Sequence, residues 1–336
     1  MTPDPADPDD AARTLVWPHG RAELQRLGAM LAPVVFSATG HADFSPMQVA
    51  PWADEPGAEA LPGVLRRLRG DWPCVPFGAT ECPPDMPTGW QPREAGDAWG
   101  HGYGANHEWT WLPQTDPSVL ALNVTTPDGT RMTRSVRAVP DAPALELELR
   151  VAVSEPRRWP IALHPTVRLD AGRAVLDVPH TGAGLTYPVP ANPGVSRLAP
   201  NRTFDRLNAV PRTDGSVADL TQFPQPIDSE ELLQLQDISG PVTLHYVDAG
   251  WALVLDWDRA LLPDMMLWVS HRGRRHAPWN GRHWALGLEP VNGAFDLGRV
   301  ATPPSNHPLA AHPGIALQPG VPWVLRYRLS ARPAPP

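Results

Sequence analysis

Apolar and polar residues alternate along much of this chain, with the period of two that is typical of β-strands. The clearest run, residues 144–153, reads Ala-Leu-Glu-Leu-Glu-Leu-Arg-Val-Ala-Val. In a strand its leucines face a core, while Glu146, Glu148 and Arg150 face water. Similar runs recur at residues 119–124, 161–169, 174–178, 242–247, 251–257, 265–269, 285–289 and 323–329.

The segments between these runs are rich in turn residues, and helical periodicity is almost absent. We expect one helical stretch, at residues 21–31. There is no strand–helix–strand alternation and no internal repeat, which argues against a parallel α/β sheet, a propeller or a solenoid. The pattern predicts an all-β fold, a large antiparallel β-sandwich or barrel with few short helices.

The domain organisation follows from composition along the chain. Residues 1–11 are rich in proline and aspartate, and we expect them to form a disordered tail. No linker interrupts the rest, so residues 12–336 are predicted to form a single domain. Residues 61–113 lack strand patterns but are rich in glycine, proline and tryptophan. A loop of this length is usually functional, and we expect it to fold over one end of the sandwich and line a cleft.

The overall composition narrows the function. The 336 residues carry a net charge of −8 and no lysine, which argues against a nucleic-acid or anionic-lipid surface and excludes a lysine Schiff base. No run approaches the roughly 18 apolar residues of a membrane span, and we expect a cytoplasmic protein. The two cysteines, Cys74 and Cys82, are expected to be reduced thiols. Fourteen tryptophans exceed the needs of a core, so some are expected at a binding surface.

The strongest candidate for chemistry is Glu289, which follows the apolar run of residues 284–288 and precedes Pro290. A carboxylate is costly to bury there unless it has a task. Trp279 and Trp284 lie nearby in the sequence, and tryptophan faces stack on the C–H face of a pyranose. The pattern predicts a sugar site; the alternative is a structural ion pair between Glu289 and Arg282.

Two histidine sites offer a partner for Glu289. Opening a pyranose ring requires a base for the anomeric hydroxyl and an acid for the ring oxygen. We assign Glu289 as the base, His164 as the acid and His101 as a positioning group, with His107 as an alternative to His101. The carboxylate is expected to be ionised and to raise the pKa of the histidine. This chemistry needs no metal and no redox cofactor.

Further residues are expected to bind the sugar through stacking or hydrogen bonds. These are Arg69, Asp71, Trp72, His107, Trp109, Trp284 and Asn292. The alternative for residues 69–73 is a loop packed by Trp72. Residues 272–275, Arg-Gly-Arg-Arg, are expected to form a solvated turn, although one arginine could reach a hydroxyl or an acidic sugar.

Other site types lack their motifs. The chain has no Cys-x-x-Cys or His-x-x-x-His pair, and we predict no metal site. It has no Gly-x-Ser-x-Gly, which argues against an ordinary serine hydrolase. A glycosidase requires a second acid about 5 to 9.5 Å from Glu289. Asp71, Asp97 and Glu108 are candidates that spacing alone does not separate.

The order of these landmarks resembles the aldose 1-epimerase (galactose mutarotase-like) superfamily. The similar features are the His101-Gly102 pair, His164 in an apolar strand and Leu-Gly-Leu-Glu-Pro at residues 286–290. The closing turn and strand, residues 314–329, are also similar. The resemblance implies a large antiparallel β-sandwich with an open sugar cleft, in which His164 is the acid and Glu289 the base. His101 would contact the ring oxygen or a hydroxyl.

The departures from the family pattern concern the substrate. The family usually has Gly-Phe and an arginine after the first histidine, whereas residues 102–105 read Gly-Tyr-Gly-Ala. This disfavours a phosphorylated sugar. The resulting hypothesis is a mutarotase that interconverts the anomers of a free sugar. The alternatives are a non-catalytic carbohydrate-binding protein on the same fold, and a glycoside hydrolase or lyase.

Overall fold

The computed structural model describes residues 10–334. Most of the tail expected at residues 1–11 therefore lies outside the described residues. At its end, the carbonyl of Asp10 accepts a hydrogen bond from Trp111 Nε1, and that of Ala11 accepts one from the Arg26 amide. The N-terminal end of the described chain is thus held against two later segments.

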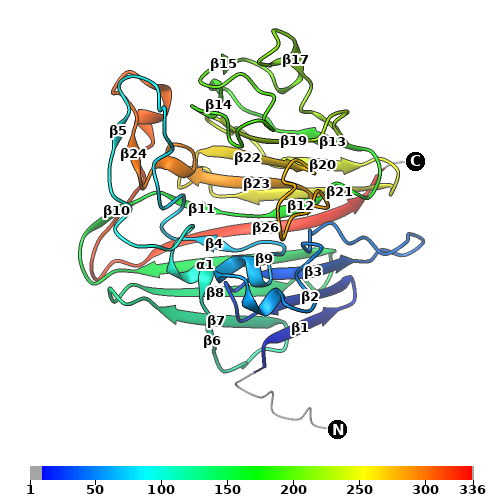
Figure 1. The fold of residues 1–336 in the computed structure, drawn as a ribbon. Helices are drawn as coiled ribbons and strands as arrows, with labels where there is room; N and C mark the ends of the chain where they lie inside the picture. The colour runs from blue at the N-terminus through cyan, green and yellow to red at the C-terminus, as the bar shows by residue number, and fades with distance from the viewer. Residues whose placement is uncertain (1–9, 335–336) are drawn as a thin grey trace.

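Two large sheets form the body of the molecule (Figure 1), and neighbouring strands in each are antiparallel. The first has nine strands in the order β18-β13-β20-β21-β26-β9-β8-β7-β6. Their bounds are β6 Thr110–Trp111, β7 Val119–Thr125, β8 Arg131–Ala138, β9 Ala144–Ala152, β13 Ala174–Asp177, β18 Gln222–Phe223, β20 Val242–Tyr246, β21 Trp251–Trp257 and β26 Trp323–Pro333.

The second sheet has eight strands. Their order is β15-β14-β19-β22-β23-β11-β4, and β12 also pairs with β23. Their bounds are β4 Pro73–Cys74, β11 Ile161–Leu163, β12 Thr166–Arg168, β14 Gly184–Thr186, β15 Thr203–Phe204, β19 Ser229–Leu235, β22 Asp264–His271 and β23 Trp284–Asn292. Figure 1 shows β22 and β23 in yellow and orange.

Smaller elements complete the described chain. The short strands are β1 Ala12–Trp17, β2 Gly20–Gln25, β3 Leu31–Phe36, β5 Gln91–Pro92, β10 Arg157–Trp159, β16 Val210–Pro211, β17 Val217–Ala218, β24 Ala301–Thr302 and β25 Ile315–Leu317. The helices are α1 Tyr103–Asn106 and the 3₁₀ turns η1 Ala58–Ala60, η2 Gly63–Arg66, η3 Leu207–Ala209, η4 Phe295–Leu297 and η5 Pro308–Ala311. None of the helices formed by residues 10–334 has the length and apolar character to span a membrane.

The alternating run that predicted a strand at residues 144–153 forms β9, as expected. Its leucines are buried, and Glu146 and Glu148 lie on the outer face. There they pair with Arg328 and Arg326 of the neighbouring β26, at 3.0 and 2.9 Å. The mostly β, antiparallel sandwich that the sequence predicts is confirmed.

The second sheet carries two different faces. Leu267 of β22 and Leu288 of β23 point into the core shared with the first sheet, where they pack with the leucines of β9. Met266 and Trp268 belong to a second apolar cluster, together with Trp72. Since side chains alternate along a strand, this second cluster lies on the opposite face of the sheet. The candidate site described below is on that face.

The helix expected at residues 21–31 is wrong. Residues 20–25 form β2, which pairs with β1 on one side and β3 on the other. Ala22 and Leu24 are buried while Arg21 is exposed, an alternation of period two. The chain then turns at Gly28, whose φ of 65° is left-handed, and a Cβ there would lie 2.9 Å from the Ala105 carbonyl oxygen.

Candidate active site

A cavity of about 140 Å³ lies over the outer face of the second sheet. Its polar lining residues are His101, His164, Arg274, Glu289 and Asp296. Its aromatic lining residues are Trp72, Trp268 and Trp279, and the remainder of the wall is aliphatic. The cavity therefore brings together the three residues predicted to carry the chemistry, which are separated by up to 188 positions (289 − 101) in the chain. Residues of the long segment 61–113 form part of its wall, as expected.

Glu289 reaches the cavity from the centre of β23, directly opposite Met266 of β22. Its side chain is buried, and Oε2 accepts no hydrogen bond from any of the described residues. Gly287 lies two residues earlier on the same face, and a Cβ at that position would be 2.5 Å from Glu289 Oε1. The glycine in the Leu-Gly-Leu-Glu sequence thus makes room for the carboxylate.

His164 follows β11 and is fixed on three sides. Its amide donates to the Trp72 carbonyl at 2.9 Å, and its ring stacks on the Trp72 ring with centroids 4.0 Å apart. Nδ1 lies 3.0 Å from Thr166 Oγ1, and Nε2 lies 3.3 Å from Glu289 Oε1. These contacts hold Nε2 of the imidazole next to the carboxylate.

His101 enters from the segment before α1, in a left-handed conformation with φ of 59°. Its amide donates to the Gly78 carbonyl at 2.8 Å. Gly102 is required next to it, because a Cβ there would lie 2.2 Å from the Val75 carbonyl oxygen. The His101 ring is perpendicular to that of His164, with centroids 5.4 Å apart. Glu289, His164 and His101 thus converge, as the sequence predicts.

Burial has the largest effect on the pKa values of Glu289, His164 and His101. It raises the pKa of Glu289, and the neighbouring Asp296 raises that pKa further. Burial also lowers the pKa of His164, with a further contribution from His101. The pKa of His101 is lowered to about 4, by burial and by Arg299. The expectation of an ionised glutamate beside a histidine of raised pKa is therefore wrong. In this buried site water would solvate neither a carboxylate nor an imidazolium, so burial favours the neutral form of each residue.

The hydrogen bonds indicate where the proton of the pair resides. Thr166 Oγ1 donates to the His164 carbonyl, so it can accept from His164 Nδ1–H. This arrangement leaves Nε2 with a lone pair that faces Glu289. A protonated Glu289 can then donate to Nε2. The pair holds one proton and carries no net charge in this form.

The structural alternative for Glu289 is wrong. Arg282 forms a two-point ion pair with Glu55, at 2.6 and 3.1 Å, and not with Glu289. This pair is exposed at the surface. Both cysteines are free thiols, as expected; Cys74 is buried and Cys82 is partly buried.

Of the seven residues expected to bind sugar, only Trp72 lines the cavity. Arg69 is buried and donates to Asp54 at 2.7 Å. Asp71 is buried in a network with Arg134 and Tyr327, whose hydroxyl donates to it at 2.7 Å. Both side chains have structural partners, through Asp71 Oδ2 and the Arg69 guanidinium, and neither lines the cavity.

His107 and Trp109 also lie outside the cavity. The His107 ring stacks on Tyr103, with centroids 3.6 Å apart, and its Nδ1 lies 2.9 Å from the Tyr103 carbonyl. Trp109 is fully buried in the main core and donates to the Gly104 carbonyl at 2.8 Å. These two residues hold the short helix α1 in place. His101, not His107, is the histidine that reaches the cavity.

Trp284 and Asn292, at the two ends of β23, lie outside it as well. The Arg272 guanidinium lies over the Trp284 ring, 4.6 Å from the ring centroid. The Asn292 amide donates to the Leu261 carbonyl at 3.2 Å, and its oxygen accepts from the Gly314 amide at 3.0 Å. Asn292 therefore joins three segments. The second-acid candidates Asp97 and Glu108 pair with arginines and do not line the cavity either.

Two polar residues in the cavity were not assigned to it from the sequence. Asp296 lies in η4, is partly buried, and accepts from the Tyr187 hydroxyl at 2.7 Å. Arg274 belongs to the turn that we expected to be solvated, with the alternative that one of its arginines reaches a ligand; Arg274 is the one that lines the cavity. Its Nε lies 3.1 Å from Glu230 Oε1, and its guanidinium packs on Trp279, 4.5 Å from the ring centroid.

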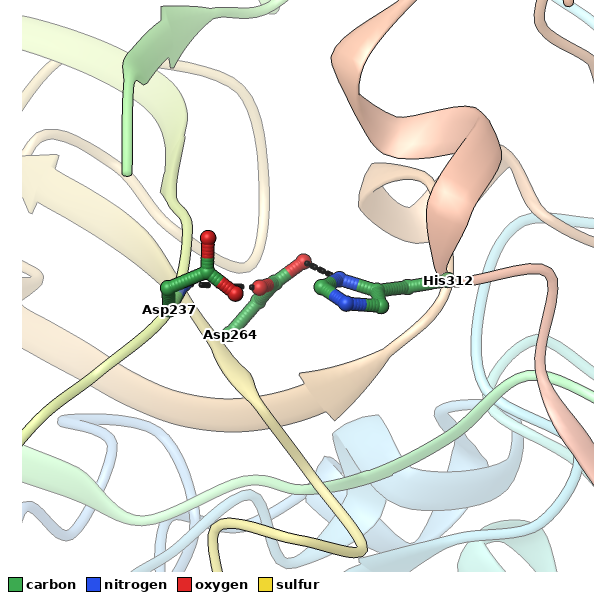
Figure 2. Close-up of side chains that lie close together, drawn as sticks. All are labelled: Asp237, Asp264 and His312. Atoms are coloured by element: carbon green, nitrogen blue, oxygen red, sulfur yellow. Dashed lines mark hydrogen bonds and ion pairs between the residues drawn. The ribbon is translucent and has the colours of Figure 1, made fainter. Parts of the chain in front are cut away.

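A second cluster, of side-chain types that can bind metal ions, lies between β19 and η5 and consists of Asp237, Asp264 and His312 (Figure 2). Asp264 is buried and accepts from the Asp237 amide, from Gln234 and from His312 Nδ1, at 3.1, 2.9 and 2.9 Å. Figure 2 shows the His312 ring pointing at the Asp264 carboxylate. Both carboxylate oxygens are engaged by these N–H donors. The group ties the start of β22 to the segment before β25.

Neither a protein-family model nor a curated protein matches this sequence. Solved structures do match over the whole chain. An Escherichia coli K12 protein, provisionally named an aldose 1-epimerase, has a TM-score of 0.65 at 16% identity, covering 96% of this chain and 99% of its own. The GalM/aldose epimerase homologue of C. elegans gives 0.62 at 14% identity, with coverage of 96% and 99%.

A galactose mutarotase-like protein from Lactobacillus casei gives a TM-score of 0.60 at 12% identity, covering 96% of this chain and 100% of its own. Identities this low establish architecture and not activity. The mostly antiparallel β architecture of this chain agrees with these whole-chain structural matches. The chain has the galactose mutarotase-like fold.

Proposed function

We propose that this protein interconverts the anomers of a free aldose by acid–base opening of the pyranose ring. The observation that carries the proposal is the 3.3 Å contact between His164 Nε2 and Glu289 Oε1 inside a cavity lined by tryptophans. Ionisable groups with shifted pKa values that converge in a cavity are typical of catalytic sites.

The geometry matches the two oxygens that must exchange a proton. The anomeric hydroxyl oxygen and the ring oxygen are bonded to the same carbon, so adjacent catalytic groups can reach both. Glu289 takes the hydroxyl proton while His164 protonates the ring oxygen and the ring C–O bond breaks. The open aldehyde rotates about its C1–C2 bond, and the reverse transfers close the ring on either face.

The pair supplies its own proton for this cycle. Burial favours the neutral form of the pair, in which Glu289 holds the proton. Transfer of that proton across 3.3 Å to His164 produces the carboxylate and the imidazolium that the reaction requires. The number of protons on the protein is the same before and after each turnover.

The surrounding residues orient the sugar. His101 has a lowered pKa, so it is neutral at physiological pH and can hydrogen-bond a hydroxyl without adding charge. Trp268 and Trp279 border the same space and offer aromatic surface to the C–H groups of a sugar. Arg274 is the single arginine of the described lining, and Glu230 already neutralises it, which favours an uncharged sugar over a phosphorylated one.

The proposal is tested by measuring anomer exchange at equilibrium by proton NMR, with a panel of common hexoses and pentoses. We expect exchange to accelerate in proportion to protein concentration for at least one aldose. Sugar binding without acceleration would favour a non-catalytic carbohydrate-binding protein. Release of reducing ends from oligosaccharides would favour a glycoside hydrolase or lyase. Either result would contradict the proposed function.

A further inference from the structure

The aliphatic part of the cavity wall is unusual for a sugar site. It consists of Val64, Leu65, Leu68, Leu232 and Met266. Leu65 and Leu232 are only partly buried, so their side chains present apolar surface to the cavity. A hexose that carries five oxygen substituents around its ring finds no hydrogen-bond partner along this wall.

The polar side of the cavity offers few free groups. Within the described lining there is no serine, threonine, asparagine or glutamine. Asp296 already accepts from Tyr187, and Arg274 is bound to Glu230. The polar atoms that have no partner within residues 10–334 include Glu289 Oε2 and His101 Nδ1. Trp72 Nε1 is also without a partner, so these atoms can serve the anomeric centre and further hydroxyls on their own side of the cavity, and none of them belongs to the aliphatic wall.

The apolar side chains lie next to the reacting pair. Met266 is the direct cross-strand neighbour of Glu289, so the two side chains stand on the same face of the sheet. Leu232 stands opposite Trp268, one strand further along the same face. In a pyranose, the ring oxygen is bonded to C5 as well as to C1. The substituent on C5 therefore lies beside the ring oxygen that the pair protonates, in a cavity whose remaining wall is aliphatic.

We infer that the substrate is a 6-deoxyaldopyranose, in which a methyl group on C5 packs against Met266 and Leu232. This inference rests on the proposed mutarotase function and adds the substrate class. A methyl group meets an apolar wall without loss, whereas the hydroxymethyl group of the parent hexose buries a hydroxyl with no partner. An apolar pocket rejects a ligand that merely gains a hydroxyl by at most about 100-fold. We expect a 10- to 100-fold preference in kcat/KM.

The test compares matched sugars that differ only at C6. Anomer exchange is measured by NMR for 6-deoxygalactose and galactose, 6-deoxyglucose and glucose, and 6-deoxymannose and mannose, in both D and L series. The inference expects the deoxy member of at least one pair to exchange about 10- to 100-fold faster in kcat/KM. Parent hexoses that exchange as fast or faster in every pair overturn the inference and leave the proposed function standing. No exchange with any sugar overturns both.

Variants of the wall supply an independent readout. Leu232→Gln places a hydrogen-bonding group on the wall and is expected to reduce the deoxy preference at least several-fold. Leu232→Met keeps the wall apolar and is the matched control, expected to retain the preference. Leu65→Gln, in the 3₁₀ turn η2, repeats the test from the other side of the cavity should Leu232→Gln fail to fold. An unchanged preference in the folded glutamine variants contradicts the assignment of this wall.

Discussion

Gly287 and Glu289 lie on one face of β23, and a Cβ at position 287 would come within 2.5 Å of Glu289 Oε1. The same Cβ would lie 3.0 Å from Trp268 Cβ on β22. The glycine is therefore what allows the carboxylate to lie flat over its own strand and meet His164. The position of the reacting group depends on the absence of a side chain two residues before it.

Gly287→Ala is expected to lower kcat by about 100-fold, because a displacement of about 1 Å of a catalytic group has an effect of this size. Kinetics of anomer exchange and a thermal melt of the variant measure the two consequences separately. A control for the exchange kinetics is Gly250→Ala, at a partly exposed turn where nothing lies within 4 Å of the added Cβ; its φ of 68° costs stability, so only the exchange rates of the two variants are compared. Full activity in Gly287→Ala would show that Glu289 does not need its present position.

The pH dependence of exchange should report the shared proton. The pair is competent while it holds one proton, so kcat is expected to fall as pH rises through the raised pKa of Glu289. It should also fall as pH drops through the pKa of His164, which lies below the ordinary 6.5. A profile with its acid limb above pH 6.5 would contradict the buried, neutral form of the pair.

Removal of the Glu289 carboxylate should stabilise the fold at high pH. The folded pKa is above the ordinary 4.5, so wild-type stability is lost as pH rises from 4.5 through the folded value. Glu289→Gln has no such loss, and its gain in melting temperature over wild type should be larger at about pH 8 than at about pH 4. Equal gains in melting temperature at the two pH values would show that burial of the Glu289 carboxylate does not destabilise the fold.

Asp71 was expected to bind sugar, and the structure instead predicts a stability effect. The side chain is buried with Arg134, so Asp71→Asn leaves the guanidinium without its counter-charge. We expect a loss of about 3 to 5 kcal/mol in the free energy of unfolding. Denaturant unfolding measures it, with Glu55→Gln as the exposed control. An unchanged stability together with a raised KM would restore Asp71 to a binding role.

The sequence predicted the antiparallel fold well, because alternating runs such as that of β9 indicate both that a segment is a strand and which of its side chains are buried. It failed at residues 21–31, where two short strands and a turn contain enough apolar residues to mimic a helix. The meeting of Glu289 and His164 in one cavity was predictable for a different reason. Glu289 stands within an apolar strand and His164 directly after one, where an ionisable group has no evident structural purpose.

Predictions for the cavity lining failed where partners lie far away in the chain. Asp71 meets Tyr327, 256 residues later, and no local pattern reveals that the carboxylate is already engaged. Trp268 and Met266 were missed because every residue of β22 is buried, which removes the alternation that would identify a face. Asp296 stands in a short 3₁₀ turn that has no strand or helix period at all.

The measurement that tests the central claim most directly is anomer exchange in Glu289→Gln, His164→Asn and the double variant, with Glu231→Gln as the control for loss of a buried carboxylate outside the cavity. If the two residues share one proton and act as a unit, each single variant loses at least about 1,000-fold in kcat and the double variant loses little more. Glu231→Gln should keep near wild-type exchange. Wild-type exchange rates in Glu289→Gln, or independent and multiplicative losses in the double variant, would contradict the account.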